Sequence, residues 1–149
     1  MKDFMRPTIE KVSSESWVMG QAGMILIGCA VREEREALAA SLRSRGYDVA
    51  ETEGGEDALL RILQQSPDLA LLDADLPGLS GLEVCCAVKK DERTRSVPVI
   101  LRAPTRQEAG PDEAWRRMTG ADAFLSRPYE PRILYWMIDS LLAGGRTRV

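Results

Sequence analysis

The sequence contains no histidine among its 149 residues. Histidine is the usual general base beside a serine or cysteine nucleophile, so its absence excludes Ser-His and Cys-His catalysis. The absence also excludes zinc sites of the Cys/His kind. The three cysteines, Cys29, Cys85 and Cys86, do not have metal-ligand spacing. An odd number of cysteines in mostly apolar surroundings is typical of a reducing compartment, and we expect the chain to be cytoplasmic.

Long apolar runs, dense basic clusters and a glycine-rich phosphate loop are also missing. The apolar stretches reach only about five to six residues, too few to span a bilayer, so no membrane association is expected. A net charge of -3 without a basic run argues against a nucleic-acid partner. The first residues mix both charges and lack the apolar core of a secretion signal. With no phosphate loop and no nucleophile–base pair, the chain is not expected to be an enzyme.

From Met24 onward, short apolar runs alternate with helical patterns. The predicted strands are Met24–Gly28, Tyr47–Glu51, Asp68–Asp73, Val97–Leu101 and Ala121–Leu125, and the predicted helices are Glu33–Arg45, Glu56–Gln64, Leu82–Lys90, Asp112–Thr119 and Arg132–Leu142. Strands that are apolar on both faces and alternate with helices indicate parallel βαβ units. We predict an α/β domain with a flavodoxin-like, doubly wound, five-stranded parallel sheet of order 2-1-3-4-5 and five helices. This domain spans 24–143, between an N-terminal extension (1–23) and a mobile C-terminal tail (144–149).

Sheets of this kind carry their sites at the carboxyl ends of the strands, near the point where the strand order reverses. The segments predicted to meet at that edge are Gly28–Val31, Asp73–Pro77, Arg102–Pro104 and Ser126–Pro128. We therefore looked for chemistry in these four segments.

Two stretches carry a family resemblance. PDLALLDADLPGLSGLEVCCAVKKDERTRSVPVI (Pro67–Ile100) has an aspartate at the end of a strand, a proline four residues later and a glycine eight residues later. GADAFLSRPYEP (Gly120–Pro131) has a strand followed by a basic residue and proline. Both stretches, in this order, resemble the receiver domain of bacterial response regulators, and the resemblance extends over Met24–Leu142.

The resemblance implies that Asp73 is at the phosphoacceptor position. Members of this family bind Mg²⁺ with an acidic pair after the first strand, and here the pair is replaced by Cys29 and Ala30. A hard cation needs oxygen ligands, which neither side chain supplies. The family's hydroxyl residue at the end of the fourth strand is replaced by Ala103.

Two further family positions are better preserved. The family's lysine after the fifth strand is replaced by Arg127, which keeps the positive charge but carries it on a planar, forked guanidinium. The aromatic switch residue of the fifth strand is Phe124. Asp75 is expected to point toward the site, where its carboxylate could replace a missing ligand. Glu33 and Glu34 are expected to lie too far along the first helix to contribute.

Alternatives remain for the retained residues. Asp73 is either a working phosphoacceptor or, as we favour, the partner of Arg127 in a fixed ion pair that closes the empty site. Cys29 is either a redox-sensing thiol beside a cation or, as we favour, a small buried filler. Cys85 and Cys86 are adjacent on a helix, so we expect one to pack in the core and the other to be partly exposed.

The last predicted helix has a second apolar stripe outside its core face. Ile133, Trp136 and Met137 occupy i, i+3 and i+4 positions, and Trp115 of the preceding helix could join them. Exposed apolar patches usually mark partner sites, and the resemblance implies association through the helix 4–strand 5–helix 5 face. The alternative is an intramolecular cover by apolar residues of the N-terminal extension, which are Ile9, Val12, Trp17 and Val18.

These observations predict an atypical receiver domain, a pseudo-receiver, that acts in bacterial signal transduction by phosphorylation-independent protein–protein interaction. No metal or cofactor is expected. The alternative is a functional single-domain response regulator, phosphorylated on Asp73, in which Asp75 rebuilds a Mg²⁺ site. An enzyme on the same fold is disfavoured because the sequence lacks a catalytic constellation.

Overall fold

The computed structural model describes residues 23–103 and 117–147 of the chain. Its elements are β1 (Met24–Gly28), α1 (Arg32–Ser44), β2 (Asp48–Thr52), α2 (Gly55–Gln65), β3 (Leu69–Asp73), α3 (Gly81–Lys90), β4 (Val99–Ala103), β5 (Ala123–Ser126) and α6 (Pro131–Thr147). The strands form one parallel sheet of order β2-β1-β3-β4-β5. The predicted flavodoxin-like sheet and its strand order are confirmed.

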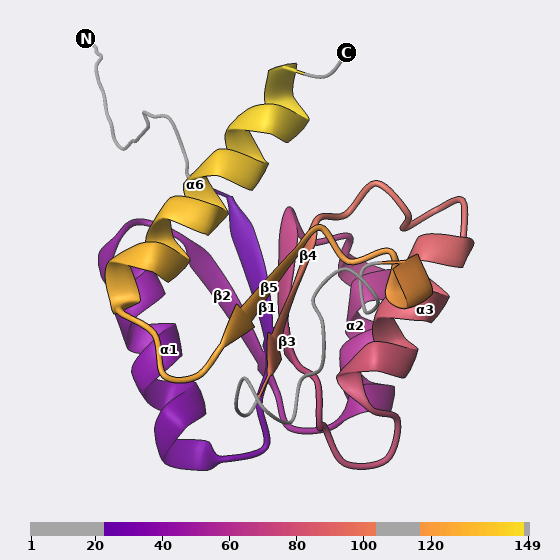
Figure 1. Cartoon of the computed structure of the whole chain (residues 1–149), viewed down its shortest axis with the longest axis horizontal. Helices are drawn as coiled ribbons and strands as arrows, with labels where there is room; N and C mark the ends of the chain where they lie inside the picture. The colour runs from indigo at the N-terminus through magenta and orange to yellow at the C-terminus, as the bar shows by residue number, and fades with distance from the viewer. Residues whose placement is uncertain (1–22, 104–116, 148–149) are drawn as a thin grey trace, which may run out of the picture.

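Helices cover both faces of the sheet, with α1 and α6 on one face and α2 and α3 on the other (Figure 1). Strand side chains alternate between these faces, which produces two apolar cores. Ile25, Ile27, Leu69 and Leu71 belong to the core under α1 and α6. The core under α2 and α3 contains the strand residues that alternate with these four, together with Phe124.

Local sequence signals explain where helix α3 begins. The Ser80 hydroxyl accepts a hydrogen bond from the Glu83 amide at 3.1 Å, and the Glu83 carboxylate accepts one from the Ser80 amide at 2.9 Å. This reciprocal capping box satisfies amides that the first helical turn would otherwise leave unpaired. It also fixes the loop that leaves β3 directly after Asp73.

Most predicted boundaries lie within one or two residues of the observed ones. The fourth strand begins at Val99 and not at Val97, because the Val97 carbonyl accepts a hydrogen bond from Lys89 Nζ at 2.7 Å. The fifth strand begins at Ala123 and not at Ala121, since the Ala121 amide donates to the Thr119 hydroxyl.

The last helix does not end at Leu142, as predicted. Helix α6 continues to Thr147, so the predicted boundary between domain and tail at residue 143 falls inside the helix. Glycine in a helix costs only about 1 kcal/mol relative to alanine, which weakens a helix without ending it. Of the predicted fourth helix, residues 117–119 are helical, and the rest lies outside the described residues, as does the extension 1–22.

Gly81 allows the β3–α3 loop to pass close to the strand it follows. A Cβ at this position would lie 2.0 Å from the Asp73 carbonyl oxygen, a distance that requires the backbone to move. At Gly54 the nearest backbone atom would be 3.4 Å away, an ordinary contact. Gly81 is therefore needed for close approach, whereas Gly54 is not.

We predict that Gly81→Ala lowers the free energy of unfolding by about 1–3 kcal/mol because it overpacks the loop against β3. Gly54→Ala, the comparison variant, should cost only about 0.5–1 kcal/mol, because Gly54 is the N-cap of α2 and alanine is a poorer cap without being overpacked. Urea denaturation followed by circular dichroism measures both. Equal stability of the two variants would contradict the role assigned to Gly81.

Candidate functional site

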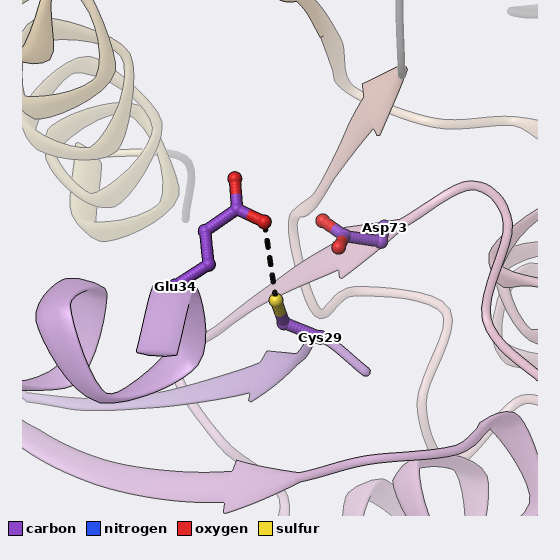
Figure 2. Close-up of side chains that lie close together, drawn as sticks. All are labelled: Cys29, Glu34 and Asp73. Carbon is purple, nitrogen blue, oxygen red and sulfur yellow. Dashed lines mark hydrogen bonds between the residues drawn. The ribbon is translucent and has the colours of Figure 1, made fainter. Parts of the chain in front are cut away.

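The strand ends place the expected residues at one edge of the sheet. Asp73 is the last residue of β3, Cys29 follows β1, Ala103 ends β4, and Arg127 follows β5. The Asp73 and Cys29 side chains converge there from neighbouring strands, and Glu34 reaches toward them from the first turns of α1 (Figure 2). Asp73 and Cys29 are both buried.

Asp73 has a cationic partner that the sequence did not reveal. Asp73 and Arg102 are paired directly across β3 and β4, and both side chains point to the face covered by α1 and α6. Arg102 Nε donates to Asp73 Oδ1 at 2.7 Å, and Arg102 Nη2 donates to Asp73 Oδ2 at 3.2 Å. This two-pronged geometry is the strongest that a guanidinium forms with a carboxylate. Only 2% of the Arg102 side chain is exposed, so the pair is enclosed by protein.

The predicted Asp73–Arg127 pair is present but secondary. Arg127 Nη2 lies 3.3 Å from Asp73 Oδ2, further than Arg102 Nε lies from Oδ1. Arg127 also lies just beyond the end of β5 and is partly exposed, whereas Arg102 is inside the domain. The carboxylate of Asp73 is thus held by two arginines, and the buried one is dominant.

Glu34 belongs to the site, and the prediction that it lies too far along the helix is wrong. Its carboxylate lies 3.2 Å from Arg102 Nη1 and 3.2 Å from Arg127 Nε. The helix begins at Arg32, so Glu34 is in the first turn, and its long side chain reaches back over the strand ends. Two carboxylates and two guanidiniums therefore form one network with balanced charge.

Burial and neighbouring charge act on the groups of this network in different directions. Burial lowers the pKa of the Arg102 guanidinium, but hydrogen bonds and attraction from Asp73 outweigh it and raise this pKa overall. Arg102 is therefore cationic at every ordinary pH. Tyr129 extends the network, since its hydroxyl accepts a hydrogen bond from Arg102 Nη1 at 3.0 Å.

Cys29 is a protonated, enclosed thiol. Burial, followed by the negative charge of Asp73, raises the pKa of this thiol from 9.0 to about 11. A reactive cysteine requires a lowered pKa and access to solvent, and Cys29 has neither. These properties favour the filler interpretation. Cys85 is buried and Cys86 partly exposed, as predicted for the adjacent pair.

The other positions that the family resemblance singled out differ in burial. Ala103 is buried at the end of β4, and the Phe124 ring packs in the core under α2 and α3. Ala30 and Asp75 are exposed. Among the described residues, the acidic and thiol groups close enough to share an ion are Cys29, Glu34 and Asp73, a set that does not include Asp75.

This ligand-capable set does not fit Mg²⁺. Its atoms lie within 4.8 Å of one another, but one of them is a thiol, and hard cations take oxygen ligands. Arg102 also contacts all three groups, through Nε and Nη2 to Asp73, Nη2 to Cys29 Sγ at 3.5 Å, and Nη1 to Glu34. A guanidinium therefore fills the space among the ligands that a cation would need.

The predicted partner surface is only partly described. Trp136 is 67% exposed and Ile133 is 42% exposed, both on α6. Met137 is half-buried and packs against the core under α1 and α6. Trp115 lies outside the described residues. The exposed part of the stripe on α6 thus consists of Ile133 and Trp136.

Sequence reasoning missed Arg102 and Glu34 for different reasons. Arg102 had a visible signal, because it is the charged residue in the otherwise apolar strand VILRA (Val99–Ala103). A charge buried in a strand requires a partner, and side-chain alternation places that partner on the next strand. Glu34 had no comparable signal, because its contribution depends on the reach of its side chain to arginines on two other elements.

A parallel sheet of this order with an aspartate ending its central strand defines a doubly wound α/β domain whose site lies at the carboxyl edge. Residues 32–139 match the response regulator receiver domain family. The chain belongs to that family, whose domains are regulatory signalling modules. Receiver domains act through other proteins of two-component signalling.

Curated relatives support the same assignment. The chain is similar to protein PilH of Pseudomonas aeruginosa, with 33% identity over 111 residues, which is 74% of this chain and 90% of PilH. It is also similar to the phosphate regulon transcriptional regulatory protein PhoB of the same organism, with 34% identity over 72% of this chain. The chain spans 46% of the length of PhoB, less than half of that relative.

Solved structures share the fold. The receiver domain of a signal transduction histidine kinase from Syntrophus aciditrophicus has a TM-score of 0.74 and 28% identity, covering 86% of this chain and 95% of that one. The response regulator TrrA of Thermotoga maritima, solved with Mg²⁺ and beryllofluoride, has a TM-score of 0.69 and 26% identity, covering 79% of this chain and 97% of that one.

Within the described ranges, no helix has the length and apolar character to cross a membrane.

We predict that Arg102→Met lowers the free energy of unfolding by about 3 kcal/mol, because it leaves Asp73 buried with only its weaker partner. Adding Asp73→Asn should recover most of the loss, since the uncompensated charge is then gone. Chemical denaturation at pH 7 measures both variants.

Arg43→Met is the matched control for this measurement. Arg43 pairs with Glu51 at 3.2 Å while half of its side chain is exposed, so its removal should cost no more than about 1 kcal/mol. If Arg102→Met cost no more than Arg43→Met, the buried network would not be the main electrostatic contribution to stability.

Proposed function

We propose that this chain is a pseudo-receiver that acts in bacterial signal transduction by binding another protein without being phosphorylated. The observation that carries the proposal is the Arg102 guanidinium, which contacts Asp73, Cys29 and Glu34 together. In the family, the strand-end aspartate and the acidic pair hold a dissociable metal ion. Here the side chain of Arg102, a residue of β4, contacts Asp73 and Cys29, which stand at two of those positions.

The occupied carboxylate of Asp73 argues against phosphoryl transfer. Each of its oxygens already accepts a hydrogen bond from an arginine, and 7% of the side chain is exposed. Attack on a phosphodonor needs one oxygen free and positive charge placed around the incoming group. The need for a free oxygen would oblige Arg102 to leave a site in which it is buried and hydrogen-bonded.

The alternative of a rebuilt Mg²⁺ site rests on Asp75. Asp75 is exposed, and it is not in the set of ligand-capable groups near Asp73. No observation in the described residues favours this alternative, and Mg²⁺ would be a cofactor only on that view.

The three free cysteines suit a reducing cytoplasm, which is where we place the activity.

The partner surface we propose is the exposed stripe on α6, as part of the helix 4–strand 5–helix 5 face. Trp136 supports it, because a large aromatic side chain is left mostly in solvent on a helix whose opposite side is buried. Tryptophan is a favoured anchor of protein interfaces. We propose a protein occupant and no nucleic acid, and of the two kinds of occupant we favour a second copy over another signalling protein.

We predict that Mg²⁺, alone or with beryllofluoride, produces no saturable NMR shift around Asp73 in the wild type. A variant with Cys29→Asp and Arg102→Val should respond to both, because it restores a carboxylate and removes the resident cation. Amide spectra of the labelled domain measure this. Saturable wild-type shifts that spread from Asp73 to Phe124 would overturn the proposal and establish a phosphorylation switch.

We predict that the wild type self-associates and that Trp136→Ala weakens its dimer by about tenfold or more, as loss of an interface anchor does. Sedimentation velocity over a range of concentrations measures the change. Leu60→Ala is the matched control, since Leu60 is 51% exposed on α2 at the other face of the sheet. A wild type that is monomeric at every concentration would contradict self-association.

A further inference from the structure

A pocket of about 470 Å³ opens between α1, the loop that leaves β5, and the beginning of α6. Both helices cover the same face of the sheet (Figure 1). Its apolar walls are formed by Ala37, Leu38, Pro128, Leu134 and the rings of Tyr129 and Tyr135. Pockets of this volume typically hold a small organic molecule. The pocket is separate from the exposed stripe around Trp136.

The pocket is chemically different at its two ends. Glu34, Arg102 and Arg127 of the charged network line it, and Ser41, which is hydrogen-bonded to Tyr135, lines it further along α1. Ser41 lies seven positions after Glu34 in the helix, which is a distance of about 10 Å. A molecule lying in the pocket would have an apolar body beside α1 and α6 and a polar group beside the arginines.

Arg127 indicates the charge of that polar group. Its Nε is buried and lacks a hydrogen-bond acceptor among the described residues, although Glu34 Oε2 is 3.2 Å away at an unsuitable angle. A guanidinium matches a carboxylate through two parallel N–H donors. The existing pairing with Glu34 leaves this match incomplete.

Glu34 is the member of the network that can be replaced. Its side chain is 34% exposed, whereas those of Arg102 and Asp73 are almost entirely enclosed. Glu34 also sits in the first turn of α1, where its side chain can turn into water without moving the sheet. A carboxylate that takes its place keeps the charge of the network balanced.

From this geometry we propose that the pocket binds a small monocarboxylate with an apolar body. The carboxylate pairs with Arg127 in place of Glu34, and the body lies between Tyr129, Leu134 and Ala37. Binding releases the first turn of α1 from Arg102 and Arg127, so the ligand changes how α1 is held against the sheet. This site goes beyond the proposed function and does not depend on whether Asp73 is phosphorylated.

The test uses 3-phenylpropionate and its neutral amide, 3-phenylpropanamide, titrated into the labelled full chain without metal or phosphodonor. The acid should give saturable amide shifts at Ala37, Tyr129 and Leu134, and the amide should not. Glu34→Gln should bind the acid about two- to fivefold more tightly, because the competing ion pair is gone. Arg127→Met should weaken binding by at least about tenfold, since charge-assisted hydrogen bonds are lost.

Glu34→Gln distinguishes competition from structural support, because a residue that only supports the pocket would weaken binding when it is replaced. Ala37→Phe, which fills the pocket, should abolish the shifts, and circular dichroism of each variant checks that it is folded. Equal binding of acid and amide would overturn the proposal. So would unchanged affinity in folded Arg127→Met, or the absence of saturable shifts with the acid in both the wild type and Glu34→Gln.

Discussion

The buried ion pair of Arg102 and Asp73 is the constraint on which the carboxyl edge of this domain depends. Neither charge could be enclosed alone, since an unpaired buried ion costs several kcal/mol. The pair exists because β3 and β4 align the two residues directly and alternation turns both toward α1 and α6. The other polar groups of the site are arranged around this pair. Glu34 and Arg127 add one charge of each sign, and the Tyr129 hydroxyl accepts a hydrogen bond from Arg102.

The network also joins parts of the domain that are distant in sequence. Glu34 belongs to α1, Arg102 to β4, and Arg127 to the loop before α6. Two further side-chain hydrogen bonds connect this region to α6. Ser41 of α1 bonds to Tyr135, and Tyr47, which follows α1, bonds to Asp139. The face covered by α1 and α6 is therefore held by directional contacts at both ends, with apolar packing between them. Movement of α1 must break contacts to two other elements.

The sequence predicted the fold well and the site only in part, for a physical reason. Apolar runs and helical spacing are local, and they placed all five strands to within two residues, most clearly the central strands β1, β3 and β4, which are buried along nearly their whole length. The position of Asp73 followed from its motif. The dominance of Arg102 over Arg127 did not, because it depends on inter-strand register and on the reach of one side chain. Glu34 likewise became part of the site through the reach of its side chain from the first turn of α1 to two arginines on other elements, which a sequence pattern does not show.

A tethered cation and a metal ion differ in how they respond to solution conditions. Mg²⁺ occupies a site according to its concentration and affinity, so the occupied fraction can change. Arg102 is attached to β4, is cationic at every ordinary pH, and is present at constant effective concentration. Under the proposed function, a signal therefore cannot act by supplying or removing this charge. A signal that reaches this edge of the sheet has to act on a side chain that can exchange with solvent, and of the four charged residues of the network Glu34 has the greatest exposure.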